Sequence, residues 1–321
     1  MESGNYSQVT EFILLGFSAD PSVQLLLFQI FLILYVITAA GNLLLIVAVR
    51  SDCRLHNSMY IFLANLSFLD ICFTSITVPN MLVNFLREKK RISYEGCLIQ
   101  VYGFLLLGET ECILLAFMAY DRYVAISNPL RYNVIMKTTV CVRMIGASWL
   151  TGGIISSVDL YFLYQLTYCG FTTIDHFFCE APSLMRLSCN DHFILSVIKV
   201  VGSLILLITP LSCILYSYTH IILAVLKIQS RRYKAFSTCI SHLIIVILFY
   251  GSAIIMYMKP EDSGHLSDKL LAVFYTSITP MMNPIIYSLR NKDVQGAIQN
   301  LWRSAIMSKP VLHITSLVVT E

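Results

Sequence analysis

The chain has 321 residues, of which 57% are hydrophobic and only 13% charged, and its mean hydropathy is +0.72. This composition excludes an ordinary soluble domain, in which about 25% of the residues are charged. The net charge is only +3, and no Lys/Arg-rich tract is interleaved with aromatic residues, which argues against nucleic acid as a partner.

The predicted elements begin with an N-terminal tail over residues 1–22, which carries the glycosylation sequon Asn5-Tyr6-Ser7. Its apolar stretch Phe12–Phe17 is shorter than the roughly 7–15 residues of a signal-peptide core, so we expect no cleavable signal. Seven apolar runs follow, at residues 23–49, 59–85, 98–121, 140–163, 194–226, 236–258 and 269–289. A helix crosses a bilayer with about 20 such residues, so the pattern predicts an all-α membrane protein, a seven-transmembrane helix bundle over residues 23–289.

A tail over residues 290–321 follows the last span. In its first part Val294, Ala297, Ile298 and Leu301 recur at helical spacing, with charged residues on the other faces. This spacing predicts a short amphipathic C-terminal helix that lies on the inner surface of the lipid bilayer.

The basic residues predict the orientation of the chain. Cytoplasmic loops are enriched in Lys and Arg, and the loop from Lys227 to Lys234 is basic with no acidic residue. The loop Arg87-Glu-Lys-Lys-Arg91 is also basic and argues for the opposite orientation. The balance over all loops predicts a multi-pass protein of the plasma membrane with an extracellular N-terminus and a cytoplasmic C-terminus.

Few strongly polar side chains interrupt the spans, and each is a functional candidate because a charge in hydrocarbon costs roughly 2.5–3.5 kcal/mol. They are Asn42, Asp70, Glu109, Glu111 and Asn283. Asp70 and Glu111 both fall well inside the hydrocarbon, where two neighbouring carboxylates must share a cation or a proton. A structural Na⁺ is one interpretation, and a protonated carboxyl that hydrogen-bonds between helices is the other. No further cofactor is expected.

Two motifs mark the inner ends of the third and seventh spans. Asp121 and Arg122 stand side by side in Met118-Ala-Tyr-Asp-Arg-Tyr-Val-Ala-Ile126. In the seventh span Pro284 frees a backbone carbonyl and permits a kink, and we expect the adjacent Asn283 to satisfy that carbonyl. The second motif therefore predicts a hinge.

These motifs resemble the rhodopsin-like receptor superfamily, together with Asn42, Asp70, Trp149 and Pro210 in their own spans. More specific blocks resemble the odorant receptors of the tetrapod, class II, kind, and the similarity runs from Phe12 to Asn291. Those blocks are Leu55-His56-x-x-Met59-Tyr60-x-Phe62-Leu63, the Met118–Ile126 motif, Ser217-Tyr218, Lys234-Ala-Phe-Ser-Thr-Cys-x-Ser-His-Leu243 and Pro280-Met-x-Asn-Pro-x-Ile-Tyr-Ser-Leu-Arg-Asn291.

The resemblance implies a receptor that binds small odorants and activates a stimulatory, olfactory-type heterotrimeric G protein to raise cyclic AMP. The coupling and switch residues that it implies are Asp121, Arg122, Tyr123, Tyr218, His242, Asn283, Pro284 and Tyr287. The chain departs from the family twice, with Ser58 where Pro is usual and Ser127 where Cys is usual. Both positions are on the cytoplasmic side, so they bear on coupling and not on ligand binding.

The resemblance also implies a disulfide between Cys97 and Cys179, which leaves Cys169 to pair with Cys189. Pairing cannot be read from the sequence alone, and Cys97 with Cys189 is the alternative. The same loop reads His176-Phe-Phe-Cys179-Glu180, a set of side chains that would suit a soft metal ion if Cys179 were a free thiolate. Oxidation of Cys179 would remove that ligand, and packing of the loop is the interpretation we favour.

The family's ligand pocket lies between the outer halves of the third, fifth, sixth and seventh spans. The residues expected to line it are Phe104, Leu105, Gly108, Glu109, Cys112, Gly202, Ile205, Leu206, Tyr250, Ile254, Tyr257, Val273 and Thr276. Such a lining suits a small, mostly hydrophobic ligand fixed by one or two polar contacts, with Tyr257 as a hydroxyl donor. Glu109 is expected either to face this pocket as a specificity determinant or to bond a Ser or Thr of a neighbouring span. For any one position, helix packing is the equal alternative.

Other classes of membrane protein fit less well. An enzyme would need a nucleophile with a base, but His220 and His242 are the His residues within the spans and have no Cys or carboxylate beside them on the same face. A light receptor would need a Lys in the seventh span, and Lys269 lies only at its edge. The remaining alternative is a rhodopsin-like receptor for another small ligand, expressed outside the olfactory epithelium.

Overall fold

The structure is a computed structural model that describes residues 9–168, 170, 172–189, 193–227, 232–258 and 265–307. Asn5 of the sequon and Cys169 lie outside these residues. The long helices are α1 (Pro21–Ser51), α2 (Ser58–Phe85), α3 (Tyr94–Ser127), α5 (Thr138–Tyr164), α7 (Phe193–Lys227) and α8 (Arg232–Met258). The last span is built from α9 (His265–Val273), a π-helical turn (Phe274–Ile278) and α10 (Thr279–Arg290).

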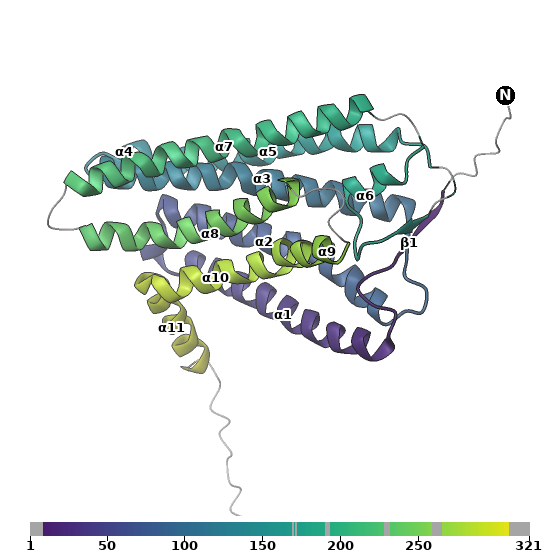
Figure 1. Cartoon of the computed structure of the whole chain (residues 1–321). Coiled ribbons are helices and arrows are strands. Elements are labelled where there is room, and N and C mark those ends of the chain that lie inside the picture. The colour runs from purple at the N-terminus through teal and green to yellow at the C-terminus, as the bar shows by residue number, and fades with distance from the viewer. Residues whose placement is uncertain are drawn as a thin grey trace, which may run out of the picture.

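These helices run side by side and form one bundle (Figure 1). Among the described residues, α1, α2, α3, α5, α7 and the run from α9 to α10 are long and apolar enough to cross a membrane. The described apolar part of α8, Cys239–Ile255, is shorter and completes the seven-helix architecture. The predicted fold class is confirmed, and the observed helices extend a few residues beyond the predicted spans.

Shorter helical elements lie between the spans and after the last one. They are a 3₁₀ turn (Cys53–Leu55), α4 (Tyr132–Ile135), α6 (Ala181–Arg186) and α11 (Lys292–Met307). The predicted amphipathic helix is present as α11, which leaves the bundle next to α1 and buries Val294 and Ala297. The Asn291 side chain accepts hydrogen bonds from the backbone N–H groups of Asp293 and Val294, so Asn291 caps the start of α11.

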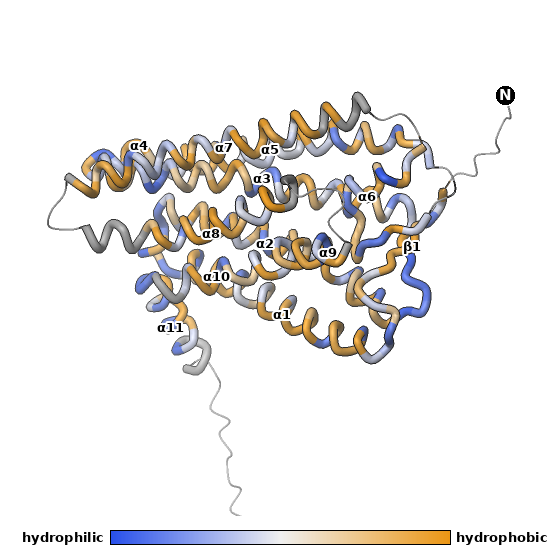
Figure 2. The backbone as a smooth tube through the Cα atoms, viewed as in Figure 1, coloured by the Kyte–Doolittle hydropathy of each residue, from blue (hydrophilic) through white to orange (hydrophobic). Residues whose placement is uncertain are grey.

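The outer surface of the bundle suits a lipid environment. Large apolar side chains such as Leu26, Ile33 and Leu150 are exposed on α1 and α5, where no protein covers them. Figure 2 shows hydrophobic residues along the middle of the helices and hydrophilic ones gathered at the two ends of the bundle. This distribution is the one expected of helices that face hydrocarbon between two aqueous layers.

Inside the bundle, small residues bring helices together. A Cβ added to Gly152 of α5 would lie 2.6 Å from the Thr110 side chain of α3, and one added to Gly103 of α3 would lie 2.5 Å from Ile76 of α2. Such close backbone approach is how membrane helices gain packing without a hydrophobic driving force. As a result α3 lies centrally and packs against α2, α5 and α7.

The seventh span differs in detail from the predicted hinge. Pro284 lies inside α10 and leaves the carbonyl of Pro280 without its helical partner. The group that donates to this carbonyl is Nδ2 of Asn42 in α1, at 3.1 Å, and not Asn283. The expectation for Asn283 was therefore wrong, because α1 approaches so closely that a Cβ on Gly41 would lie 3.2 Å from the Pro284 ring.

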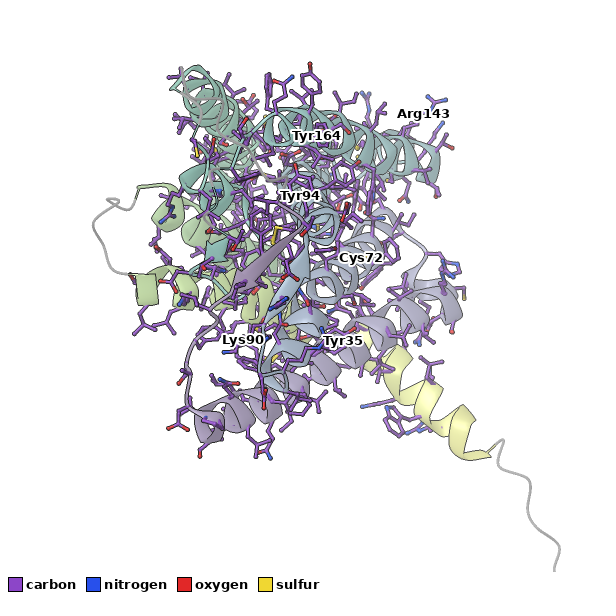
Figure 3. The ribbon with its side chains drawn as sticks, turned by 90° about the vertical axis from the view of Figure 1, so that its right-hand side faces the viewer. Tyr35, Cys72, Lys90, Tyr94, Arg143 and Tyr164 are labelled. Carbon is purple, nitrogen blue, oxygen red and sulfur yellow. A yellow bond between two sulfur atoms is a disulfide. The ribbon has the colours of Figure 1, made fainter. Side chains whose placement is uncertain are left out.

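A small sheet covers the end of the bundle next to the N-terminus. Strand β1 (Glu11–Leu14) pairs antiparallel with β2 (Arg91–Ser93) and parallel with β3 (Thr173–Ile174). The Lys90 ammonium donates to the carbonyls of Leu15 and Ser18, which fixes the chain between β1 and α1. Figure 3, which looks onto this end, shows Lys90 and Tyr94 beside the strands.

Candidate functional site

An aromatic layer lies inside the bundle below the sheet, centred on Phe104 of α3. Its ring centroid is 5.1 Å from that of Phe73 in α2, 5.3 Å from Phe178 in the loop after α5, and 5.6 Å from Tyr275 in the π-helical turn. Aromatic rings at these separations attract one another beyond the gain from burial. Phe104, one of the predicted pocket residues, thus connects α2, the loop and the last span.

The loop is fixed over this layer by a disulfide between Cys97 and Cys179, which confirms the predicted pairing. The backbone N–H of Cys179 also donates to Oε1 of Gln100 at 2.8 Å, while Nε2 of Gln100 donates to the Ile76 carbonyl. The Cys97–Cys179 bond rules out the alternative of Cys97 with Cys189, and Cys189 is itself disulfide-bonded. Its predicted partner, Cys169, lies outside the described residues.

The His176–Glu180 segment packs and does not present a free metal ligand set. Cys179 is oxidised, and burial lowers the pKa of His176 to about 3, so that its imidazole is neutral at physiological pH. The neutral ring accepts a long hydrogen bond from the Phe178 N–H, 3.5 Å to Nδ1, and stacks on Phe177. Next to it Asp175 forms an ion pair of 2.6 Å with Lys269 of α9, which ties the loop to the last span.

Deeper in the bundle, three predicted residues meet at one point. The Tyr250 hydroxyl of α8 donates to the Cys112 carbonyl of α3 at 3.0 Å. The Cys112 thiol lies 3.2 Å from the Tyr250 hydroxyl oxygen and 3.6 Å from the Leu206 carbonyl of α7. The third, fifth and sixth spans are therefore held together directly below the aromatic layer.

The other predicted pocket residues divide into three groups. Glu109 and Thr276 are buried, and Ile254 and Val273 are half-buried, which is compatible with a lining role. Gly108 faces the Phe73 ring, while Leu105 packs with the buried residues around Cys97. Gly202 and Ile205 lie on the outer face of α7, Ile205 with 61% of its surface exposed, so they point toward the bilayer. The side chain of Tyr257 lies outside the described part of the chain.

The sequence reasoning missed Phe73, Phe178 and Tyr275. Phe178 had a usable signal, because it precedes Cys179, and the implied disulfide anchors that residue at Cys97. Phe104 follows Cys97 by two helical turns, about 10 Å along α3. A bulky side chain beside Cys179 should therefore reach toward Phe104.

A second polar cluster lies at mid-bundle around Asp70 of α2, which is almost fully buried. Asn283 Nδ2 donates to both Asp70 oxygens at 3.0 Å, and Glu111 is buried on α3, which packs against α2. The oxygens Asn42 Oδ1, Glu111 Oε1 and Asn283 Oδ1 are buried without a hydrogen-bond partner in the described structure. Buried oxygens of this kind are usually satisfied by water or a cation.

At the far end of the bundle from the sheet, Asp121 is completely buried and lies 3.1 Å from the guanidinium of Arg122. Its Oδ1 accepts from the hydroxyls of Ser58 (2.8 Å) and Tyr132 (2.9 Å), which also contact each other. Burial and the nearby Asp121 carboxylate raise the pKa of Tyr132 to about 12, which keeps its phenol protonated as a donor. Asp121 thus connects α2, α3 and α4.

The remaining switch residues lie close to this end. Tyr218 of α7 makes a hydrogen bond of 2.8 Å with Nδ1 of His242 in α8, and the two rings stack. Tyr287 is buried in α10, and the Tyr123 ring lies 5.8 Å from that of His220. The Tyr218–His242 pair is one of the contacts that spans five and six would lose if they separated here.

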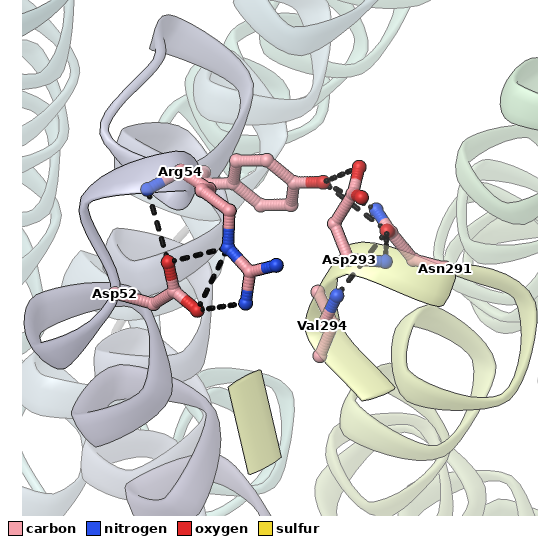
Figure 4. Close-up of polar contacts among 6 residues, drawn as sticks. Asp52, Arg54, Asn291, Asp293 and Val294 are labelled. Atoms are coloured by element: carbon pink, nitrogen blue, oxygen red, sulfur yellow. Dashed lines mark hydrogen bonds and ion pairs between the residues drawn. The ribbon is translucent and has the colours of Figure 1, made fainter. Parts of the chain in front are cut away.

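The start of α2 is also joined to α11 (Figure 4). The Tyr60 hydroxyl exchanges hydrogen bonds with the Asn291 side chain at 2.8 and 3.1 Å and reaches Asp293 at 3.4 Å. On the other side of this junction, hydrogen bonds from Arg54 lower the pKa of Asp52 to about 2. The beginning of α2 therefore contacts both the Asp121 cluster and the amphipathic helix.

Comparison with known proteins agrees with this architecture. Residues 31–304 match the family model described as olfactory receptor. The chain is 50% identical over 312 residues to olfactory receptor 5M5 of Mus musculus, with 96% of this chain and 98% of the relative covered. It is 48% identical over 305 residues to olfactory receptor 1L4 of Homo sapiens, with 94% and 98% covered.

Squid rhodopsin has the same fold, with a TM-score of 0.69 over 90% of this chain and 88% of that structure at 17% identity. The family match covers most of the chain, and the relatives are similar from end to end, so the resemblance extends over the whole bundle and both polar clusters. The chain belongs to the olfactory receptors, a family of rhodopsin-like, multi-pass G-protein-coupled receptors that are not enzymes.

Proposed function

We propose that this receptor binds small, mostly hydrophobic odorants and raises cyclic AMP through a stimulatory heterotrimeric G protein. The ligand site of the proposal lies between the Phe104 layer and the Cys112–Tyr250 contact, with Glu109 as its charged member. Apolar and aromatic walls with few polar groups suit a small volatile ligand. The disulfide-anchored loop, held to α9 by the Asp175–Lys269 ion pair, supports a site that is closed from the outside.

The proposed orientation has β1 and the loop outside the cell and α4 and α11 inside. Two observations support it. Cys97, Cys179 and Cys189 are disulfide-bonded at the end that carries β1, and disulfides persist in the oxidising extracellular environment. Arg54, Arg122 and Arg131 lie toward the opposite end, as the enrichment of basic residues in cytoplasmic loops requires.

The proposed coupling residue is Arg122. The observation that carries this role is its contact with the buried carboxylate of Asp121, which holds a charged side chain inside the cytoplasmic end of the bundle. When α3 and α8 separate, as such bundles do on activation, Arg122 becomes available to the G protein. If α8 also moves away from α7 in this step, the Tyr218–His242 hydrogen bond breaks with it.

The experiment is a cyclic AMP reporter in cells that express the receptor with a stimulatory G protein. Arg122→Ala should abolish the response at unchanged surface level, because the proposed contact is lost. Arg143→Ala is the matched control, since Arg143 is exposed on α5 and points away from the bundle (Figure 3). A full response from Arg122→Ala would disprove this role.

A structural Na⁺ is also proposed, held between Asp70 and Glu111 and completed by neutral oxygens. The buried oxygens of Asn42 and Asn283 support this reading, because hard cations take oxygen ligands. Within the described residues no group of three or more His, Cys, Asp or Glu side chains is arranged to hold a metal ion. The proposed ion therefore relies on two carboxylates and uncharged ligands.

A further inference from the structure

The start of α2 carries a contact that the receptor function described so far does not use. Ser58 is the first residue of α2 and is almost fully buried, and its hydroxyl donates to Asp121 Oδ1 at 2.8 Å. Tyr132 of α4 donates to the same oxygen at 2.9 Å. One carboxylate oxygen therefore joins three elements through two hydroxyl donors.

The two hydroxyl donors and Arg122 act on different oxygens of Asp121. The hydroxyls occupy Oδ1, whereas the guanidinium of Arg122 lies 3.1 Å from Oδ2. A carboxylate group is rigid, so hydrogen bonds that hold one oxygen also fix the direction of the other. Ser58 and Tyr132 therefore orient Oδ2 toward Arg122. Hydrogen bonds to a buried charged group are also stronger than those between neutral groups.

The hydroxyl is the distinctive contribution of residue 58, because the backbone at this position does not depend on it. Asn57, the preceding residue, has extended φ and ψ of −118° and 168°, which is the conformation that a following proline requires. At the first position of a helix the N–H has no partner within the helix, so proline fits there. Ser58→Pro should therefore keep the start of α2 while it removes the donor to Asp121.

We propose that Ser58 is a positioning residue that lowers the basal activity of this receptor by holding Asp121 in the orientation that pairs with Arg122. The inference rests on the proposed role of Arg122 in activation. Ser58 favours the resting state, because the orientation of Asp121 that it fixes is the one that pairs with Arg122, and this pair breaks when Arg122 turns to the G protein. A contact made in one state alone shifts the equilibrium toward that state.

The first test measures basal cyclic AMP, normalised to surface receptor, without ligand. Ser58→Ala and Ser58→Pro should each raise it about three- to tenfold, as expected from one lost hydrogen bond of ordinary net strength, since Tyr132 still donates to the same oxygen. Ser58→Thr, which keeps the hydroxyl, should retain the basal level of the parent. Ser148→Ala is the matched control, since Ser148 is fully buried but its hydroxyl donates within its own helix, to the Met144 carbonyl.

Tyr132→Phe should raise basal activity as Ser58→Ala does, and the double variant should exceed the stronger single variant only slightly. Both hydroxyls hold the same oxygen, so their effects are coupled and not additive. Basal activity equal to that of the parent in Ser58→Ala and Ser58→Pro, with a normal ligand response in both, would overturn the inference.

A second readout is independent of the G protein. In the purified receptor, hydrogen–deuterium exchange over residues 132–135 should be faster in Ser58→Ala than in the parent and in Ser148→Ala, because α4 loses the Ser58 contact on Tyr132. Faster exchange in α4 of a receptor that gives no cyclic AMP response would support the role of Ser58 at Asp121. It would contradict only the proposed coupling of Arg122 to the G protein. Unchanged exchange in α4 would refute the Ser58 contact itself.

Discussion

Single polar residues control the interior of this bundle, and the amide of Asn42 is a clear case. Its Nδ2 satisfies the Pro280 carbonyl that Pro284 leaves without a helical partner. Asn283 is thereby left to hold both oxygens of Asp70. A contact between α1 and α10 thus determines which groups surround the proposed Na⁺ site.

The Na⁺ proposal predicts a loss of ion dependence in two variants. In membranes titrated with Na⁺ at constant ionic strength, basal cyclic AMP production by the parent should fall as Na⁺ rises. Asp70→Asn and Glu111→Gln should each remove this fall, because each variant removes one of the two charged oxygen ligands of the proposed ion. Asp159→Asn, on α5, is the control. If all variants titrate as the parent does, no shared ion site exists.

At this scale the sequence predicted which residues are buried and polar but not all of their partners. Asp70 and Glu111 were identified because charges are costly in hydrocarbon, and Asp121 and Arg122 were identified from their motif at the inner end of the third span. Their neighbours depend on contacts between helices far apart in sequence, such as Asn42 with Pro280 or Ser58 with Asp121. Ile205 was expected to line the family's ligand pocket, but the rotation of α7 exposes it on the outer face of the bundle.

Among the elements, the sheet next to the N-terminus was the least predictable. Strand β1 has four residues and pairs with strands that begin at residues 91 and 173. Such pairing leaves little periodic signal in the sequence, because alternation is recognised over about 4–8 residues, and β1 only just reaches this length while β2 and β3 are shorter. The π-helical turn at Phe274–Ile278 was equally hidden, since it interrupts an apolar run without changing its composition.

The alternation within β1 gives a matched pair of variants. Phe12 is fully buried next to the Tyr94 and Tyr168 rings, whereas Ile13 is 37% exposed on the opposite face. Phe12→Ala should destabilise the receptor by about 3–5 kcal/mol, the usual cost of deleting a buried ring. Thermal unfolding of the purified receptor should show a clear decrease in Tm for Phe12→Ala and little change for Ile13→Ala. An unchanged Tm for Phe12→Ala would mean that the burial of this ring does not stabilise the fold.

At the scale of the whole molecule, two polar clusters and one aromatic layer lie one after another along α3. The Phe104 layer is followed by the Cys112–Tyr250 contact, the Asp70–Glu111 region and finally the Asp121–Arg122 pair. A ligand that displaces α8 at Tyr250 would act on the Tyr218–His242 pair through the same helix. This order explains how binding near one end could release Arg122 at the other.

The most direct test of this account is a cyclic AMP dose–response series with a panel of volatile alcohols, ketones and amines on the parent and on Glu109→Gln. We predict that a subset of the panel raises cyclic AMP in the parent and that Glu109→Gln changes the ranking of those ligands, because a buried carboxylate in the ligand site discriminates between polar groups. Arg122→Ala should stay silent throughout. The proposed function would be contradicted if the parent receptor reaches the cell surface, is co-expressed with a stimulatory G protein and responds to no member of the panel.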